Sequence, residues 1–126
     1  MAKVVLVVDD EQGMVSVLSR LLTDEGWIVH TAVSGGEALL ALKRARPHVV
    51  LVDYVMPVMD GAKLAAALRR EPLGKELAIV MMSGLPQSMV TRRTKAYDAF
   101  VRKPFNFADL LRTLDASLVR ARPKKR

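Results

Sequence analysis

The stretch VLVVDDEQG, residues 5–13, joins four apolar residues directly to three acids. A continuous apolar run of this kind is typical of a strand that is buried on both faces of a parallel sheet. Asp9, Asp10 and Glu11 then stand at the carboxyl end of that strand, where their negative charges repel one another. The stretch therefore predicts a buried strand and, at its end, a site that needs a positive charge.

Four further runs indicate strands along the chain. Residues 49–52, 77–82 and 99–101 are also continuously apolar, whereas residues 27–32 mix polar and apolar side chains and suit an edge strand. Helical patterns fall between these runs, so the chain alternates strand and helix five times. Because crossovers between parallel strands are right-handed, the simplest arrangement is an α/β, doubly wound (βα)5 fold. We expect a five-stranded parallel sheet in the order 2-1-3-4-5 with helices on both faces.

Capping residues indicate where the helices begin and end. Ser34 has a glutamate three residues later, which is the spacing of a capping box, and Asp60 and Asn106 are suited to cap the helices that follow them. Gly26 is a suitable stop for the first helix. Residues 88–95 lack a clean apolar stripe and contain two threonines and a valine, which predicts a short or frayed helix.

The composition fits one ordinary globular domain. Of the 126 residues, 51% are hydrophobic and 26% are charged, and the absence of cysteine excludes disulfides and thiolate metal sites. No apolar run approaches the ~20 residues of a membrane span. The N-terminal MAKVVLVV is too short and too soon followed by acids to be a signal peptide. We therefore expect a soluble, cytoplasmic protein that does not bind a membrane.

The net charge of +7 comes largely from the C-terminal end of the chain. RARPKKR, residues 120–126, carries five cations and no acid, which leaves a net charge of +2 for residues 1–119. We expect one domain over residues 1–119 and a disordered basic tail over residues 120–126. Two other interpretations remain open. The tail could bind nucleic acid or another acidic partner electrostatically, or it could begin a linker to a further domain.

Polar residues follow four of the five predicted strands at the same edge of the sheet. Asp9 and Asp10 follow the first strand, and Asp53, Ser83 and Lys103 follow the third, fourth and fifth. Because the first and third strands are neighbours in the predicted order, their carboxylates should meet in one cleft. Oxygen ligands without histidine or cysteine suit a hard divalent cation, Mg²⁺ or in its place Mn²⁺. A metal, a lysine and a hydroxyl around one carboxylate can stabilise phosphoryl transfer to that carboxylate.

Four motifs resemble the receiver domain of two-component response regulators, of the CheY-like kind. They are VVDDE (residues 7–11), LVDYVMPVMDG (51–61), MMSG (81–84) and FVRKPF (100–105), and the resemblance covers residues 3–119. The resemblance implies a flavodoxin-like fold and a bacterial, single-domain signalling protein that is not a conventional enzyme. Its implied partners are a histidine kinase or a histidine phosphotransfer protein, which supplies a phosphoryl group, and an unknown output protein.

The resemblance also assigns roles to individual residues. Asp53 matches the phosphoacceptor and would also contact the metal. Asp10 matches the direct metal ligand, Asp9 the neighbouring acid that acts through a water, and Val55 a residue whose backbone carbonyl is a further ligand. Ser83 matches the hydroxyl that bonds the transferred phosphoryl group. Glutamate at position 11 is expected only to start a helix.

Three residues near the end of the last strand complete this assignment. Lys103 matches the lysine that pairs with the phosphoryl group, and Pro104 makes the Lys103–Pro104 bond a candidate cis peptide. Phe100 matches the aromatic residue that turns inward after phosphorylation. That movement changes the face formed by the fourth helix, fifth strand and fifth helix, and a local change of charge would thus bias a two-state element.

Two features depart from the family pattern. Ser83 and Lys103 are 20 positions apart, a little less than is usual, and the shortfall lies in the weak helix at residues 88–95. The output face is therefore expected to be unusual or mobile. Val55 and Leu85 are apolar where side chains influence the access of hydrolysing water, which leads to the hypothesis of slow self-dephosphorylation.

Two other functions stay open. A phosphohydrolase of the haloacid dehalogenase type has a D-x-D motif after its first strand, whereas Asp53 is followed by Tyr54 and Val55. A DNA-binding regulator would need a recognition helix, and residues 1–119 contain no such unit, so only the basic tail favours nucleic-acid binding or a fragment of a larger regulator.

Overall fold

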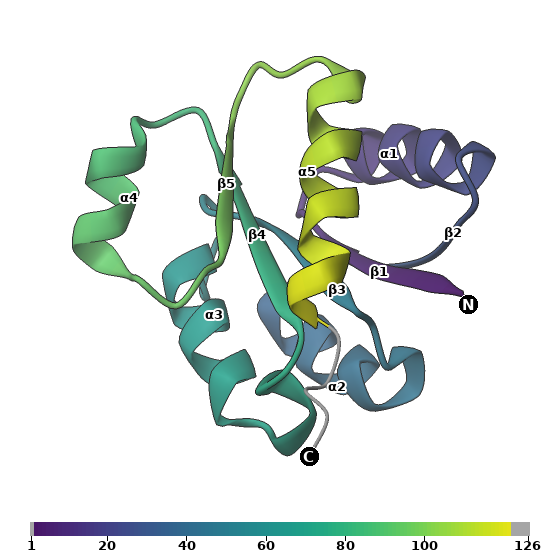
Figure 1. Ribbon diagram of the computed structural model, residues 1–126. Helices are drawn as coiled ribbons and strands as arrows, with labels where there is room; N and C mark the ends of the chain where they lie inside the picture. Colours follow the sequence, from purple (N-terminus) through teal and green to yellow (C-terminus); the bar gives the residue numbers. More distant parts are fainter. Residues whose placement is uncertain (1, 122–126) are drawn as a thin grey trace.

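Five parallel strands lie side by side in the order β2-β1-β3-β4-β5, and the predicted topology is confirmed. The computed structural model describes residues 2–121 (Figure 1). The strands are β1 Lys3–Val8, β2 Trp27–Ala32, β3 Val49–Asp53, β4 Ala78–Ser83 and β5 Ala99–Arg102. β2 is an edge strand, as its mixed sequence predicts, and β5 forms the opposite edge.

Within residues 2–121, four α-helices and one 3-10 turn connect the strands, and a fifth helix follows β5. They are α1 Gln12–Asp24, α2 Gly35–Ala45, α3 Gly61–Arg70, η1 Pro72–Gly74, α4 Gln87–Arg93 and α5 Phe107–Ala121. Helices α2, α3 and α4 contribute to the core on one face of the sheet, and α1 and α5 to the core on the other (Figure 1). The predicted covering of both faces of the sheet is thus confirmed.

Both faces of the central strands are buried, which explains their continuous apolar sequences. In β1, Leu6 and Val8 belong to the core beneath α2 and α3, whereas Val5 and Val7 belong to the core beneath α1 and α5. All four side chains have an exposed fraction of 0%. Full burial of such a side chain contributes about 1.5–3 kcal/mol. Because both faces of these strands are packed, a strand cannot shift along its own axis relative to its neighbours. Its last residue is therefore held at a fixed position at the edge of the sheet.

The predicted caps form where the sequence places them. Ser34 Oγ accepts from the N–H of Glu37 at 3.1 Å, and Asp60 Oδ1 accepts from the N–H of the third residue of its helix at 2.9 Å. Asn106 Oδ1 accepts from the N–H of Asp109 at 2.8 Å and so starts α5. Each bond satisfies one of the N–H groups that the first turn of a helix leaves unpaired.

The short helix predicted at residues 88–95 is α4, which has seven residues and ends at Arg93. It begins one residue earlier and ends two residues earlier than predicted. At the other end of the chain, α5 continues to Ala121, two residues into the segment expected to form the basic tail. Residues 122–126 of that tail lie outside the described residues. Within residues 2–121, no helix is both long enough and apolar enough to cross a membrane.

Candidate functional site

The carboxyl ends of the strands meet at one edge of the sheet and carry the predicted site residues there. Asp9 directly follows β1, Asp53 ends β3 and Ser83 ends β4. Lys103 follows β5, and its backbone N–H donates to the carbonyl of Ser83 at 2.8 Å. Parallel strands in register therefore bring residues that are up to 94 positions apart in the chain to the same edge.

Three carboxylates form a cluster at this edge. Asp9, Asp10 and Asp53 each offer one carboxylate oxygen, and these three oxygens lie within 4.8 Å of one another. The exposed fractions of Asp9 and Asp53 are 1% and 7%, whereas Asp10 is exposed. Two of the three negative charges are therefore largely removed from water, which is unfavourable unless positive charge lies nearby.

Lys103 supplies part of that positive charge. Its Nζ lies 3.3 Å from Oδ1 of Asp53, to which it donates a hydrogen bond, and 3.6 Å from Oδ2 of Asp9. One lysine cannot neutralise three carboxylates, so the cluster retains an excess of negative charge when all its acids are ionised.

The burial and the excess of negative charge make Asp53 a weaker acid than usual. Burial, followed by the negative charge of Asp9, raises the pKa of Asp53 from 3.8 to about 6. Lys103 and a backbone hydrogen bond from Val55 act in the opposite direction, but they are outweighed. A divalent cation in the cluster would remove the cause of the raised pKa by stabilising the ionised carboxylate.

The donor set fits a hard divalent cation. One oxygen of Asp9 accepts from the N–H of Glu11 at 3.0 Å, but its buried Oδ2 has no hydrogen-bond partner among the described residues. An unsatisfied buried carboxylate oxygen costs free energy unless another group binds it. Asp9, Asp10 and Asp53 together offer the all-oxygen ligands that Mg²⁺ prefers. Glu11 stands at the N-cap position of α1, in agreement with the prediction that it starts this helix, although its side chain makes no capping hydrogen bond.

Ser83 ends β4 at this edge, whereas Phe100 lies earlier in its strand, opposite Met81 of β4. Ser83 has an exposed fraction of 1%, and its Oγ accepts from the N–H of Leu85 at 3.0 Å. Phe100 lies in β5, is partly buried, and packs against the core beneath α2, α3 and α4. The Lys103–Pro104 peptide bond is cis.

One contact of this edge was not predicted from the sequence. Nε of Arg102 donates to the carbonyl of Gly84 at 2.9 Å and thereby ties the end of β5 to the loop that follows Ser83. The residue pattern offered no signal for it, because an arginine at an exposed strand position is ordinarily solvated.

The response regulator receiver domain model matches residues 5–115 of the chain. The chain therefore belongs to the family of response regulator receiver domains. This membership favours the receiver interpretation over the phosphohydrolase alternative, and it agrees with the fold and the position of the acidic cluster.

Its relatives include bacterial transcriptional regulators. The probable transcriptional regulatory protein TcrX of Mycobacterium tuberculosis is 34% identical over 116 residues, which cover 92% of this chain and 50% of TcrX. The phosphate regulon transcriptional regulatory protein PhoB of Rhizobium meliloti is 31% identical over 122 residues, which cover 95% of this chain and 54% of PhoB. The chain thus spans about half the length of these curated relatives.

Solved structures show the same fold. The chemotaxis protein CheY4 of Vibrio cholerae superposes with a TM-score of 0.88 at 34% identity, covering 93% of this chain and 99% of CheY4. The response regulator TrrA of Thermotoga maritima, in complex with Mg(2+)-BeF, has a TM-score of 0.81 at 30% identity and covers 90% of this chain and 97% of TrrA.

Proposed function

We propose that this chain is a phosphorylation-dependent signalling module that accepts a phosphoryl group on Asp53. The donor is a histidine kinase or a histidine phosphotransfer protein, and the reaction requires Mg²⁺ or Mn²⁺. The observation that carries the proposal is the placement of Asp53 itself. Its buried carboxylate lies in a cluster with Asp9 and Asp10 and 3.3 Å from the Nζ of Lys103.

The side chains divide the work of binding and transfer. Asp10, Asp53 and the backbone carbonyl of Val55 would hold the divalent cation directly, and Asp9 would hold it through a water. When bound, the cation neutralises negative charge on the cluster and on the incoming phosphoryl group. An Asp53 oxygen attacks the phosphorus, so that a P–O bond forms and the P–N bond to the donor histidine breaks. The donor imidazole leaves with the bonding electron pair and takes up a proton.

Lys103 and Ser83 act on the product of this transfer. The ammonium of Lys103, already 3.3 Å from Asp53, pairs with the phosphoryl oxygens, and the hydroxyl of Ser83 can donate to them. The new group adds about −1.5 to −2 charges at pH 7, by analogy with phosphorylated hydroxyls. That charge draws Ser83 toward the phosphoryl group, Phe100 turns inward, and the α4–β5–α5 face changes its affinity for an output protein.

An apolar groove beside the site favours the interpretation that the phosphodonor is a protein. It lies between α1 and the segment that follows β5, and Lys103 forms part of its lining. Its apolar side chains are those of Met14, Val17, Leu18, Leu21, Pro104, Phe105 and Phe107. The exposed fraction of Val17 is 56%, and covering such a surface is favourable. A donor that docks its own apolar side chains here would bring a histidine close to Asp53.

The lifetime of the phosphorylated form is set by the access of water to Asp53. We propose that hydrolysis is slow because Val55, with an exposed fraction of 61%, and the partly buried Leu85 are apolar and cannot orient an attacking water. Val55→Asn is therefore expected to shorten the lifetime of the phosphorylated protein. An unchanged lifetime, measured by loss of the added mass over time, would contradict this part of the proposal.

We also propose that the receiver domain of residues 1–119 carries out this function by itself, in the cytoplasm. A specific observation favours a second possibility, in which the chain is the receiver part of a larger DNA-binding regulator. Its curated relatives are transcriptional regulators of about twice its length. DNA-binding assays with the chain and with residues 120–126 deleted test whether the tail contributes. A DNA affinity that the deletion does not change would remove the support that the tail gives to the second possibility.

A mass measurement tests the central proposal. The protein is incubated with Mg²⁺ and acetyl phosphate, and its intact mass is expected to rise by one phosphoryl group. Asp53→Asn is the matched control, since it keeps the shape of the side chain but removes the nucleophile, and EDTA removes the metal. A mass gain that persists in the Asp53→Asn variant, or no gain in the wild type, would refute the proposal.

A further inference from the structure

Helix α4 is attached to the sheet more lightly than its neighbours are. Val90 is its buried residue, whereas α3, three residues longer, buries five residues, Leu64 and Leu68 among them. Figure 1 shows α4 at the margin of the molecule, well away from α1 and α5. The position of α4 therefore depends strongly on polar contacts, which are individually weak and can be exchanged.

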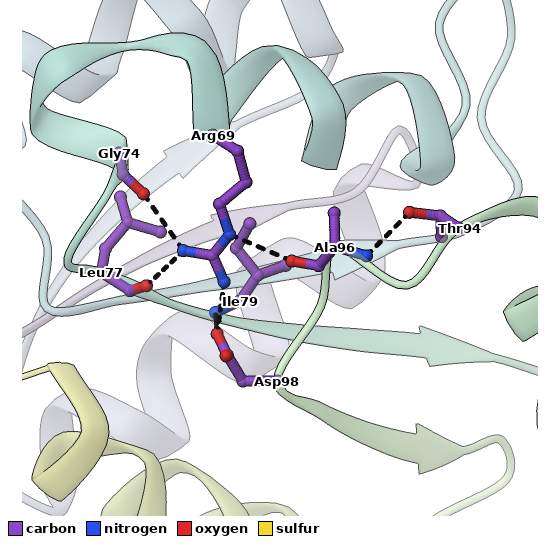
Figure 2. A network of polar contacts seen from close by, with 7 residues as sticks. All are labelled: Arg69, Gly74, Leu77, Ile79, Thr94, Ala96 and Asp98. Carbon is purple, nitrogen blue, oxygen red and sulfur yellow. Dashed lines mark hydrogen bonds and ion pairs between the residues drawn. The ribbon is translucent and has the colours of Figure 1, made fainter.

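The backbone that follows α4 is firmly held. The guanidinium of Arg69, at the end of α3, donates to the carbonyl of Ala96 at 3.1 Å and to the carboxylate of Asp98 at 2.6 Å (Figure 2). The same carboxylate accepts from the N–H of Ile79 in β4 at 2.8 Å, and Thr94 Oγ1 accepts from the N–H of Ala96 at 3.1 Å. The backbone on both sides of residue 97 is thus fixed to α3 and β4.

The Tyr97 side chain leaves this fixed backbone and touches two elements. Its hydroxyl lies 2.7 Å from Oγ1 of Thr91 and accepts from Nε2 of Gln87 at 3.2 Å, so it is bonded to two turns of α4. Its ring centroid lies 6.1 Å from that of Phe100 in β5, at an interplanar angle of 49°. One partly buried side chain therefore joins the proposed switch residue to the helix beside it.

We propose that Tyr97 is the positioning residue that couples Phe100 to α4 in this chain. Because the backbone around Tyr97 is held by Arg69 and Asp98, an inward turn of the Phe100 ring is passed on by rotation of the Tyr97 ring. That rotation breaks or re-forms the hydroxyl bonds to Thr91 and Gln87 and so changes how firmly α4 is held. This inference rests on the proposed function and names the element through which it reaches a partner.

Hydrogen exchange of the backbone amides of residues 87–93 tests the coupling. The wild type, Tyr97→Phe and Thr91→Val are each compared with and without acetyl phosphate and Mg²⁺, and the intact mass of every sample is recorded. In the wild type, phosphorylation is expected to change the exchange rate of the α4 amides by about fivefold. This is the factor by which the loss or gain of one hydrogen bond changes the equilibrium for local opening of the helix. Tyr97→Phe keeps the ring but removes the hydroxyl, and it should abolish most of this difference while the mass gain remains. Thr91→Val removes one of the two hydroxyl bonds and should reduce the difference without abolishing it.

Thr113→Val is the matched control for the threonine variant. Like Thr91, Thr113 donates its hydroxyl to the backbone carbonyl four residues earlier, but it lies on α5 and has no bond to Tyr97. It should keep the wild-type difference.

If Tyr97→Phe accelerates exchange equally in both states and preserves the difference, the residue is merely structural and the coupling is refuted. A phosphorylated wild type without an α4 difference refutes it as well. A wild type without the mass gain refutes the proposed function instead, and the coupling with it.

Discussion

The edge of the sheet at β1 and β3 and the face at α4 and β5 are built in opposite ways. At the first, Asp9 follows β1 and Asp53 ends β3, and the four apolar residues before each acid have exposed fractions of 0%. This packing holds the acids together against their repulsion. At the second, a helix of seven residues is held through Tyr97 and an ion pair between Arg93 and Asp60. A site that must keep its geometry is fixed by large, non-directional burial, whereas a face that must change is held by small, directional bonds.

The largest expected effect tests whether α3 is packed against the sheet more firmly than α4. Leu64→Ala in α3 removes a side chain with an exposed fraction of 0% and should destabilise the protein by about 2–5 kcal/mol. Met89→Ala in α4 removes a side chain that is 47% exposed and should change stability by no more than about 0.5 kcal/mol. Urea unfolding measures both. Equal losses would mean that α4 is packed as firmly as α3.

The next largest effect is the loss of stability caused by the buried charge of Asp53 in the acidic cluster. Asp53 has a pKa of about 6 in the folded protein against 3.8 as its ordinary value, so folding favours its protonated form. Stability is therefore lost as the pH rises from 3.8 to about 6, and the loss is complete at pH 7. At 1.36 kcal/mol per pKa unit it amounts to about 3 kcal/mol. In EDTA, which removes divalent cations, Asp53→Asn should recover a large part of this lost stability.

The pH dependence provides the control for this variant. Thermal unfolding in EDTA should show Asp53→Asn above the wild type at pH 7, and the gap should close as the pH approaches 4, where both proteins carry an uncharged group. A gap that is the same at pH 4 and pH 7 would show that charge is not its cause. Mg²⁺ at pH 7 should stabilise the wild type more than the variant, because the variant has lost a ligand.

The smallest effect concerns the loop that follows β3. Val58 has an exposed fraction of 99% and a backbone φ of 67°, a conformation that is unfavourable for a β-branched residue. Val58→Gly should stabilise the protein by about 1 kcal/mol, since glycine adopts this conformation without strain. The unfolding midpoint in urea measures the gain. Arg46→Gly, at a φ of 45°, is the comparison position and should gain less, because arginine is not β-branched.

Much of the fold and of the candidate site could be predicted because burial leaves a periodic record in the sequence. Strands buried on both faces are continuously apolar, and parallel strands end at one edge, so Asp9, Asp53, Ser83 and Lys103 could be placed together before any distance was known. The caps at Ser34, Asp60 and Asn106 were equally readable, because each satisfies N–H groups only a few residues away.

The tertiary structure alone decided which polar side chains are buried and which distant polar groups meet. The sequence does not indicate which of Asp9 and Asp10 is buried, yet the first is buried and 3.6 Å from Lys103 whereas the second is exposed. Nor does it indicate that Arg69 pairs with Asp98, 29 residues away, or that Tyr97 joins α4 to Phe100. Local patterns report which face of a strand or helix is apolar, but hydrogen bonds between elements depend on how those faces pack, and that is settled only by the whole fold.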